Sequence, residues 1–264
     1  MMRFAKLTIL GAIGALVLGT AAQAHMPYLL PTLFDVGKGG DHVTVTSSFG
    51  EDAFVPEIGM KDAPFHFIRP DGTRGEVGAP TYLRDLTIFE ADLKAEGTYR
   101  LTTGQRLGRM GKMYAVGGKW IIAGEDGAPP AGAREVAVQS TTLAEAYVTR
   151  GAASAGALNP IGTALEVQPL THPSEIASGS DAKFRLLFDG KPLAGTEVTL
   201  LRAAGNYDGK KVAATVTSDV QGNFTLRPED AGLYLMLVRH RTEAPAGSAT
   251  PYRSYTYTLA FDAA

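Results

Sequence analysis

Short segments rich in β-branched and aromatic residues recur along almost the whole chain, and this pattern constrains the fold more than any other feature. The run 232–240 is apolar enough to be a central strand. The run 252–261 alternates cleanly, so that Tyr255, Tyr257 and Leu259 share one face of a strand. Many short strands separated by turn residues favour β-sandwiches over units that alternate strand and helix.

The predicted strands fall into two groups on either side of a stretch rich in Gly, Ala and Ser. That stretch is typical of a flexible linker. We therefore predict an all-β fold with a signal peptide at 1–24, an N-terminal β-sandwich domain at 25–149, a linker at 150–164 and a C-terminal Ig-like or transthyretin-like sandwich at 165–264. The run 143–148 is compatible with either a helix or a strand. The other predicted strands are 41–49, 65–68, 87–91, 97–102, 119–123, 165–167, 183–188, 195–201, 213–217 and 223–227.

The first 24 residues have the three parts of a secretory signal peptide. Arg3 and Lys6 precede an apolar run at 7–18, and Ala22-Gln23-Ala24 fits the small-x-small rule for cleavage. The apolar run is shorter than the roughly 20 residues of a membrane span. We expect cleavage after Ala24, a periplasmic location and no membrane span in the mature chain.

Charge and cysteine content exclude several functional classes. Removal of the two basic residues of the signal peptide leaves 23 basic and 27 acidic residues. Nucleic-acid binding needs clustered Lys and Arg, so we expect no nucleic-acid partner. The chain has no Cys, and it carries no nucleophile elbow, no zinc-protease helix motif and no phosphate-binding loop. We therefore predict that the protein is not an enzyme.

Six segments carry a resemblance: 25–31 (HMPYLLP), 69–72 (RPDG), 165–173 (LEVQPLTHP), 187–195 (LFDGKPLAG), 217–224 (TSDVQGNF) and 231–235 (AGLYL). Together they resemble the DUF4198 family, whose members are exported proteins often associated with nickel or cobalt uptake. The resemblance implies a β-sandwich fold, a periplasmic location, a metal ion as partner and a transporter of the inner or outer membrane as a second partner. Two of the matching pieces are turn sequences that also occur in other transthyretin-like domains, so they support the fold more than the function.

His25 is the sharpest candidate for chemistry, because it becomes the first residue if cleavage follows Ala24. Its free α-amine and its ring Nδ1 can then chelate one metal ion, and a second imidazole would complete a histidine brace. A site rich in nitrogen favours copper over nickel, and the resemblance points to nickel or cobalt. The alternative is that His25 stands at the boundary by chance or serves packing.

The second imidazole is predicted to come from His66 or His42, and nearby carboxylates can add ligands or orient the ring. We expect His172 to make local loop hydrogen bonds and His240, which lies between two arginines, to be structural. The basic segment 106–114 is expected to be a mobile surface loop.

Three hypotheses follow for the function. The first is a periplasmic protein of metal binding or metal delivery, acting in envelope transport of nickel, cobalt or copper. The second is an envelope scaffold that binds a partner and no metal. The third is a copper oxidase built on a histidine brace.

Overall fold

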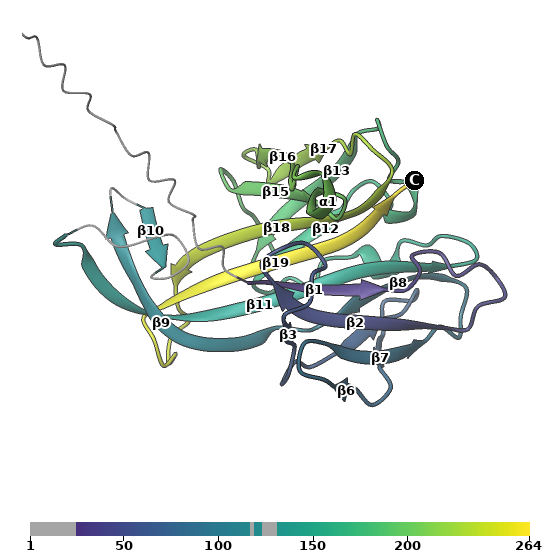
Figure 1. Cartoon of the computed structure of the whole chain (residues 1–264), viewed down its shortest axis with the longest axis horizontal. Helices are drawn as coiled ribbons and strands as arrows, with labels where there is room; N and C mark the ends of the chain where they lie inside the picture. The colour runs from purple at the N-terminus through teal and green to yellow at the C-terminus, as the bar shows by residue number, and fades with distance from the viewer. Residues whose placement is uncertain (1–24, 117–118, 123–130) are drawn as a thin grey trace, which may run out of the picture.

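Nearly all of the regular structure in the computed structural model is β (Figure 1), as the sequence predicts. The structure describes residues 25–116, 119–122 and 131–264. The signal peptide predicted at 1–24 lies outside the described residues. Three short helical turns interrupt the strands: η1 (Gly156–Leu158), η2 (Pro173–Glu175) and α1 (Gly205–Asp208). None of the helices in the described part of the chain has the length and apolar character that crossing a membrane requires.

The strands form three sheets. The first, here the N-terminal sheet, has the order β1 (Met26–Pro31), β2 (His42–Gly50), β7 (Thr87–Asp92) and β6 (Thr81–Tyr82), with β3 (Ile58–Gly59) paired to β2. The last, here the C-terminal sheet, contains β12 (Leu165–Pro169), β13 (Ala182–Phe188), β14 (Lys191–Pro192) and β17 (Asn223–Leu226).

A central sheet of ten strands lies between these two layers (Figure 1). Eight of its ten strands follow one path, and the other two lie off this path. Its strands, in order, are β16 (Val212–Thr217), β15 (Glu197–Arg202), β18 (Gly232–Glu243), β19 (Tyr252–Ala263), β11 (Arg134–Arg150), β8 (Gly97–Thr102), β4 (His66–Ile68) and β5 (Arg74–Glu76), with β9 (Arg106–Val116) and β10 (Lys119–Ile122) off this path.

The central sheet supplies one wall of two separate hydrophobic cores. In β11, Ala144 and Ala146 pack toward the N-terminal sheet, whereas Leu143 and Tyr147 pack toward the C-terminal sheet. Successive side chains of a strand point to opposite faces, so one strand can serve both cores. The predicted alternation in β19 is confirmed, because Tyr255, Tyr257 and Leu259 all lie in the second core.

One long-range pairing joins the two halves of the chain. Val138–Ala146 of β11 runs parallel to Tyr252–Ala260 of β19. Both predicted sandwiches are present as layers, but they share the central sheet. The division of the chain into the domains 25–149 and 165–264 stays a prediction.

The segment predicted as a flexible linker is held against the first half of the chain. The Thr98 backbone N–H donates to Ser154 Oγ at 3.0 Å, and the Ser154 N–H donates to Thr98 Oγ1 at 3.2 Å. A Cβ on Gly156 would lie 2.1 Å from the Pro70 carbonyl oxygen, so this position accepts only glycine. The small residues of this segment therefore permit a close approach between backbones.

Two other predictions are settled by the strands. The run 143–148, for which helix and strand were both open, is part of β11. The expected surface loop at 106–114 was wrong, because this segment forms β9 and pairs with β11. Met110 still reaches solvent, with 66% of its surface exposed. The Gly residues in this stretch are more typical of a loop than of a strand. The partner strand, β11, lies about thirty residues away in the sequence, so local pattern does not reveal the pairing.

Candidate functional site

His25 and two carboxylates converge where β1 begins. β1 pairs antiparallel to β2, with Met26 opposite Gly50. His25 directly precedes Met26 and Glu51 directly follows Gly50, so the pairing of the two strands brings these residues together. Their side chains and that of Glu57 form one exposed group, which we call the His–Glu group.

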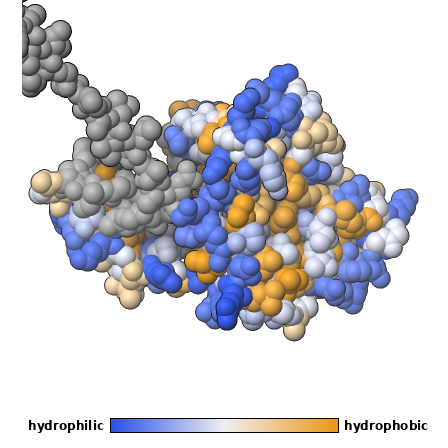
Figure 2. Space-filling view, in the orientation of Figure 1, coloured by the Kyte–Doolittle hydropathy of each residue, from blue (hydrophilic) through white to orange (hydrophobic). Residues whose placement is uncertain are grey.

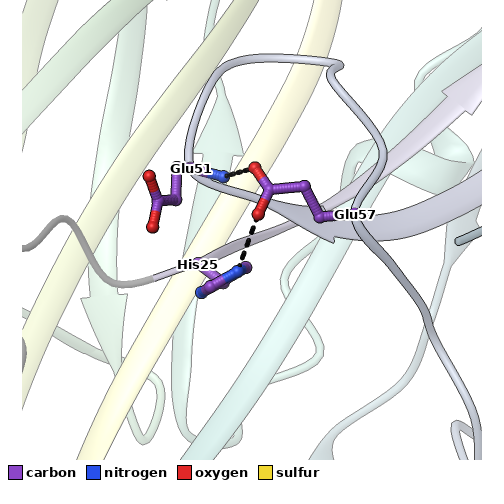
Figure 3. A group of neighbouring side chains, drawn as sticks. All are labelled: His25, Glu51 and Glu57. Carbon is purple, nitrogen blue, oxygen red and sulfur yellow. Dashed lines mark hydrogen bonds and ion pairs between the residues drawn. The ribbon is translucent and has the colours of Figure 1, made fainter.

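The hydrogen bonds of Glu57 organise the His–Glu group (Figure 3). Its Oε2 lies 2.8 Å from His25 Nε2, and its Oε1 accepts the backbone N–H of Glu51 at 2.9 Å. The Glu57 N–H in turn donates to the Phe49 carbonyl oxygen at 3.0 Å, which closes the loop that follows β2. Figure 3 shows the Glu57 carboxylate pointing toward the imidazole ring, with the Glu51 side chain to one side.

The spacing of the three side chains suits a metal ion. One ligand atom from each residue lies within 4.8 Å of the other two. Two ligand atoms on opposite sides of a transition-metal ion, each at about 2.1 Å, are about 4.2 Å apart. The His25 and Glu57 side chains are 38% and 36% exposed, so small rotations can close the remaining difference. The residues present therefore fit a transition-metal ion.

The loop that carries the carboxylates is braced by the C-terminal half of the chain. Asn206 Nδ2 donates to the Ala53 carbonyl oxygen at 3.0 Å, and Lys211 Nζ forms an ion pair with Asp52. Within the loop, Phe54 has a φ of 62° and packs edge-on against Tyr28, with the ring centroids 5.6 Å apart. A positive φ is costly for an aromatic residue, so contacts around it must hold the loop in this shape.

An exposed apolar surface lies next to the His–Glu group. Ile58 follows Glu57 directly and is 49% exposed. The Gly59 N–H donates to the Arg84 carbonyl oxygen, which places β3 beside the segment that carries the exposed side chains of Tyr82 and Leu83. Figure 2 shows hydrophobic residues gathered over this part of the molecule. We call Ile58, Tyr82 and Leu83 the apolar patch.

The structure does not bring His42 to His25. His42 starts β2, and the antiparallel pairing places Gly50, at the far end of β2, beside Met26. Eight residues of strand separate these positions by roughly 27 Å. The His42 ring pairs with Asp41 at 2.8 Å, and this hydrogen bond raises the pKa of the imidazole.

His66 is also absent from the His–Glu group. It lies in β4 of the central sheet, where its Nδ1 is 2.8 Å from the Pro64 carbonyl oxygen. A carbonyl oxygen only accepts, so Nδ1 carries the proton. Burial lowers the pKa of the ring, which keeps it neutral and leaves Nε2 as an acceptor.

The other two histidines take structural positions, as expected. His172 caps η2 and lies 3.0 Å from Thr98 Oγ1 through its Nε2. The ring of His240 packs against Phe188, with the centroids 4.7 Å apart, and burial lowers its pKa. Neither residue joins a group of three metal-ligating side chains among the described residues.

A second charged group, missed by sequence reasoning, is buried between the central and C-terminal sheets. Arg100 donates from Nε and Nη2 to the two carboxylate oxygens of Glu145, at 2.8 and 2.7 Å. Tyr257 donates to Glu145 Oε2 at 2.8 Å, and the Glu166 carboxylate lies 3.8 Å from Arg100. We call Arg100, Glu145 and Glu166 the buried ionic cluster. The signal was a charged residue inside each of three strands: Arg100 in β8, Glu145 in β11 and Glu166 in β12.

The fold and the exposed group together define a class: an all-β protein of three layered sheets, with a histidine and two carboxylates of metal-ligating type at the start of its first strand. The chain belongs to the DUF4198 family, a domain of unknown function whose family model matches residues 22–242. This confirms the resemblance drawn from the sequence. No curated protein matches the chain.

Two solved structures are similar to this chain. The D0-D1 domain of intimin shares 12% identity with a TM-score of 0.22, over 88% of this chain and 96% of that one. A DUF4785 family protein from Legionella pneumophila shares 11% identity with a TM-score of 0.26, over 80% of this chain and 51% of that one. This chain therefore spans about half the length of the Legionella protein. These values carry no functional argument.

Proposed function

We propose that the protein is an exported, non-catalytic metal-binding protein that holds a divalent transition-metal ion, copper, nickel or cobalt, at the His–Glu group for envelope metal uptake. The observation that carries this proposal is the convergence of His25, Glu51 and Glu57 at the predicted mature N-terminus. Histidine nitrogen and carboxylate oxygen are both ligands for such ions.

The hydrogen bond between His25 and Glu57 favours a different role for each of the two ring nitrogens of His25. Ring Nε2 faces the Glu57 carboxylate at 2.8 Å, which leaves Nδ1 as the second ring nitrogen. Cleavage after Ala24 would free the α-amine on the same residue, and the amine and Nδ1 could then chelate one ion. Metal-bound histidines commonly donate their other N–H to a carboxylate, which fixes the tautomer and the ring orientation. In this arrangement Glu57 orients the ring and Glu51 offers an oxygen ligand.

The predicted second imidazole of a histidine brace is replaced in this proposal by a carboxylate. Neither His42 nor His66 joins the group. An added oxygen ligand makes the site less specific for copper than a purely nitrogen site, which suits reversible delivery of several ions. The apolar patch beside Glu57 supports delivery to a membrane transporter, because exposed apolar surfaces are common at protein–protein contacts.

The test is a metal titration of the mature chain with its native N-terminus at His25. Isothermal titration with Cu(II) and Ni(II) is expected to show one site, and a chain with one extra N-terminal residue is expected to bind at least about 100-fold more weakly. A His25→Ala chain should lose the same binding. Equal affinity in the native and extended chains would refute chelation by the N-terminal residue.

The scaffold hypothesis makes the opposite prediction for the same titration. A protein that binds only a partner would show weak metal binding that is unchanged by the extension and by Glu51→Ala. The two hypotheses therefore separate in one experiment.

A further inference from the structure

A cavity of about 310 cubic ångströms lies between the central sheet and the segment that leads into β12. Its floor is formed by His66 of β4, Arg74 of β5 and Thr102 of β8, which share one face of the sheet. Ile161 and Thr163 form part of the opposite wall. Sites for small molecules begin at about this volume, so the cavity suits a ligand of one small ring.

The walls of the cavity offer both donors and acceptors of hydrogen bonds. His66 uses Nδ1 to bond the Pro64 carbonyl oxygen at 2.8 Å, so the lone pair of Nε2 remains as an acceptor. The hydroxyls of Thr102 and Thr163 each accept one hydrogen bond, and within the described part of the chain each keeps its O–H to donate. A hydroxyl group both donates and accepts, so a ligand with several hydroxyls matches these atoms.

The charged groups of the walls are already paired with one another. Arg100 makes its two-point pair with Glu145, and the Glu166 carboxylate lies 3.8 Å from the same guanidinium. Arg74 pairs with Glu76 at 2.8 Å. A charged ligand of either sign would therefore lose its hydration without meeting an unpaired countercharge, and that loss is costly. An uncharged polar ligand avoids this cost.

The segment that covers the cavity is fixed in place by hydrogen bonds. Glu166 accepts the backbone N–H groups of Ile161 and Gly162, each at 2.8 Å. Gln105 Nε2 donates to Thr163 Oγ1 at 3.2 Å, which ties this segment to the chain between β8 and β9. The walls are thus formed before a ligand arrives, so binding need not order them.

Apolar side chains line the rest of the cavity. Pro64, Leu143 and Ile161 contribute its hydrocarbon surface. The C–H groups of a sugar ring can pack against such a surface, while the hydroxyls of the ring meet the polar atoms. We propose that this cavity binds an uncharged polyhydroxyl ligand of the size of one sugar ring, separate from the His–Glu group and independent of any metal ion.

Four probes of similar size test this site: glucose, glucosamine, glucuronate and cyclohexanol. Each is titrated into the mature chain with EDTA at about pH 6, where the amine is protonated and the carboxylate is ionised, and amide chemical shifts are followed by NMR. Glucose is expected to shift Gln105 and Thr163 and to bind at least about fivefold more tightly than the other three. Tyr207 of α1, which follows β15 on the far side of the central sheet, should stay unchanged.

The three other probes show how the proposal can fail. Equal or tighter binding of glucosamine would assign the cavity to cations, of glucuronate to anions, and of cyclohexanol to apolar ligands. Each of these results, or the binding of none of the four probes, would overturn the proposal.

Two variants locate the interaction. His66→Phe removes the Nε2 acceptor and narrows the cavity, and it should abolish glucose binding with a normal thermal transition. Thr163→Val removes one hydroxyl at an exposed position and is expected to weaken glucose at least about threefold; it decides the question if His66→Phe does not fold. Thr225→Val, the same change at an exposed position of β17, is the control and should bind as the parent chain does. Unchanged affinity in either cavity variant would contradict the site. Because EDTA removes metal, these results stand apart from the metal titration.

Discussion

The His–Glu group and the buried ionic cluster contain similar side chains in opposite surroundings. Each holds one basic side chain and two carboxylates. In the His–Glu group the side chains of His25 and Glu57 are 38% and 36% exposed, whereas Arg100 and Glu145 are 1% and 0% exposed. The difference in burial decides what each group can do.

Burial commits the atoms of the ionic cluster to one another. Both oxygens of Glu145 are bonded, to Arg100 and to Tyr257. A buried charge without a partner is costly, so such a cluster must be internally satisfied. The His–Glu group makes one ion pair and one backbone hydrogen bond, and it leaves lone pairs facing solvent. Exposure thus leaves this group free to bind a ligand, whereas the ionic cluster joins the layers of the fold.

Glu145→Ala tests the structural role of the ionic cluster most severely. The change leaves Arg100 buried without its two-point partner, and we expect the free energy of unfolding to fall by about 3–5 kcal/mol in urea denaturation. The matched control is Glu76→Ala, which removes the exposed partner of Arg74 and should change stability little. Similar losses in both variants would contradict the contrast between buried and exposed pairs.

A pair of tyrosines tests whether the cluster depends on its hydrogen bonds. Tyr257 donates to Glu145, whereas the hydroxyl of Tyr147 is buried with no partner among the described residues. Tyr257→Phe is expected to cost about 1.5–3 kcal/mol, because the acceptor is charged. Tyr147→Phe should stay within about 0.5 kcal/mol or stabilise the fold. Thermal and urea unfolding of both variants measure the difference, and a larger loss in Tyr147→Phe would reverse the assignment.

Glu57 variants test the exposed group through metal affinity. Glu57→Ala removes the acceptor that orients His25, and we expect affinity for Cu(II) to fall about 10- to 100-fold. Glu57→Gln keeps an oxygen acceptor and should lose less. Glu197→Ala, another exposed carboxylate, is the control and should bind as the parent chain does. Unfolding should be almost unaffected in all three, in contrast to Glu145→Ala.

The smallest expected effect concerns the contacts between the loop that carries Glu51 and Glu57 and the C-terminal half of the chain. Lys211→Met removes the ion pair between Lys211 and Asp52. The Lys211 side chain is 50% exposed and the Asp52 side chain is 31% exposed. An exposed pair contributes little, so metal affinity should fall by at most about fivefold, and the difference should shrink at high salt. The control, Lys112→Met, removes the ion pair between Lys112 of β9 and Glu135 of β11 and should leave metal affinity unchanged. Equal effects of the two variants would show that these contacts do not support the site.

Much of the fold follows from local pattern alone. Alternation in β19 predicts its two faces, and the apolar run of β18 predicts a strand with neighbours on both sides, which the structure confirms as β15 and β19. These features depend on side chains only a few residues apart. Successive side chains of a strand point to opposite faces, so the sequence decides which side chains share a face. His25 was predicted as a candidate ligand from local sequence too, because its position relative to Ala24 is a matter of sequence.

Which strands pair was decided only by the tertiary structure. The sequence predicts His66 or His42 as the partner of His25. Antiparallel pairing places the far end of β2 beside β1, and so it brings Glu51 and Glu57 to His25 instead. The parallel pairing of β11 with β19 spans more than a hundred residues and creates the sheet that buries Arg100 beside Glu145. The sequence determines which faces are apolar, and it predicts cleavage after Ala24. Long-range strand pairing determines which side chains meet, because hydrogen bonds between strands have the same chemistry whatever the separation along the chain.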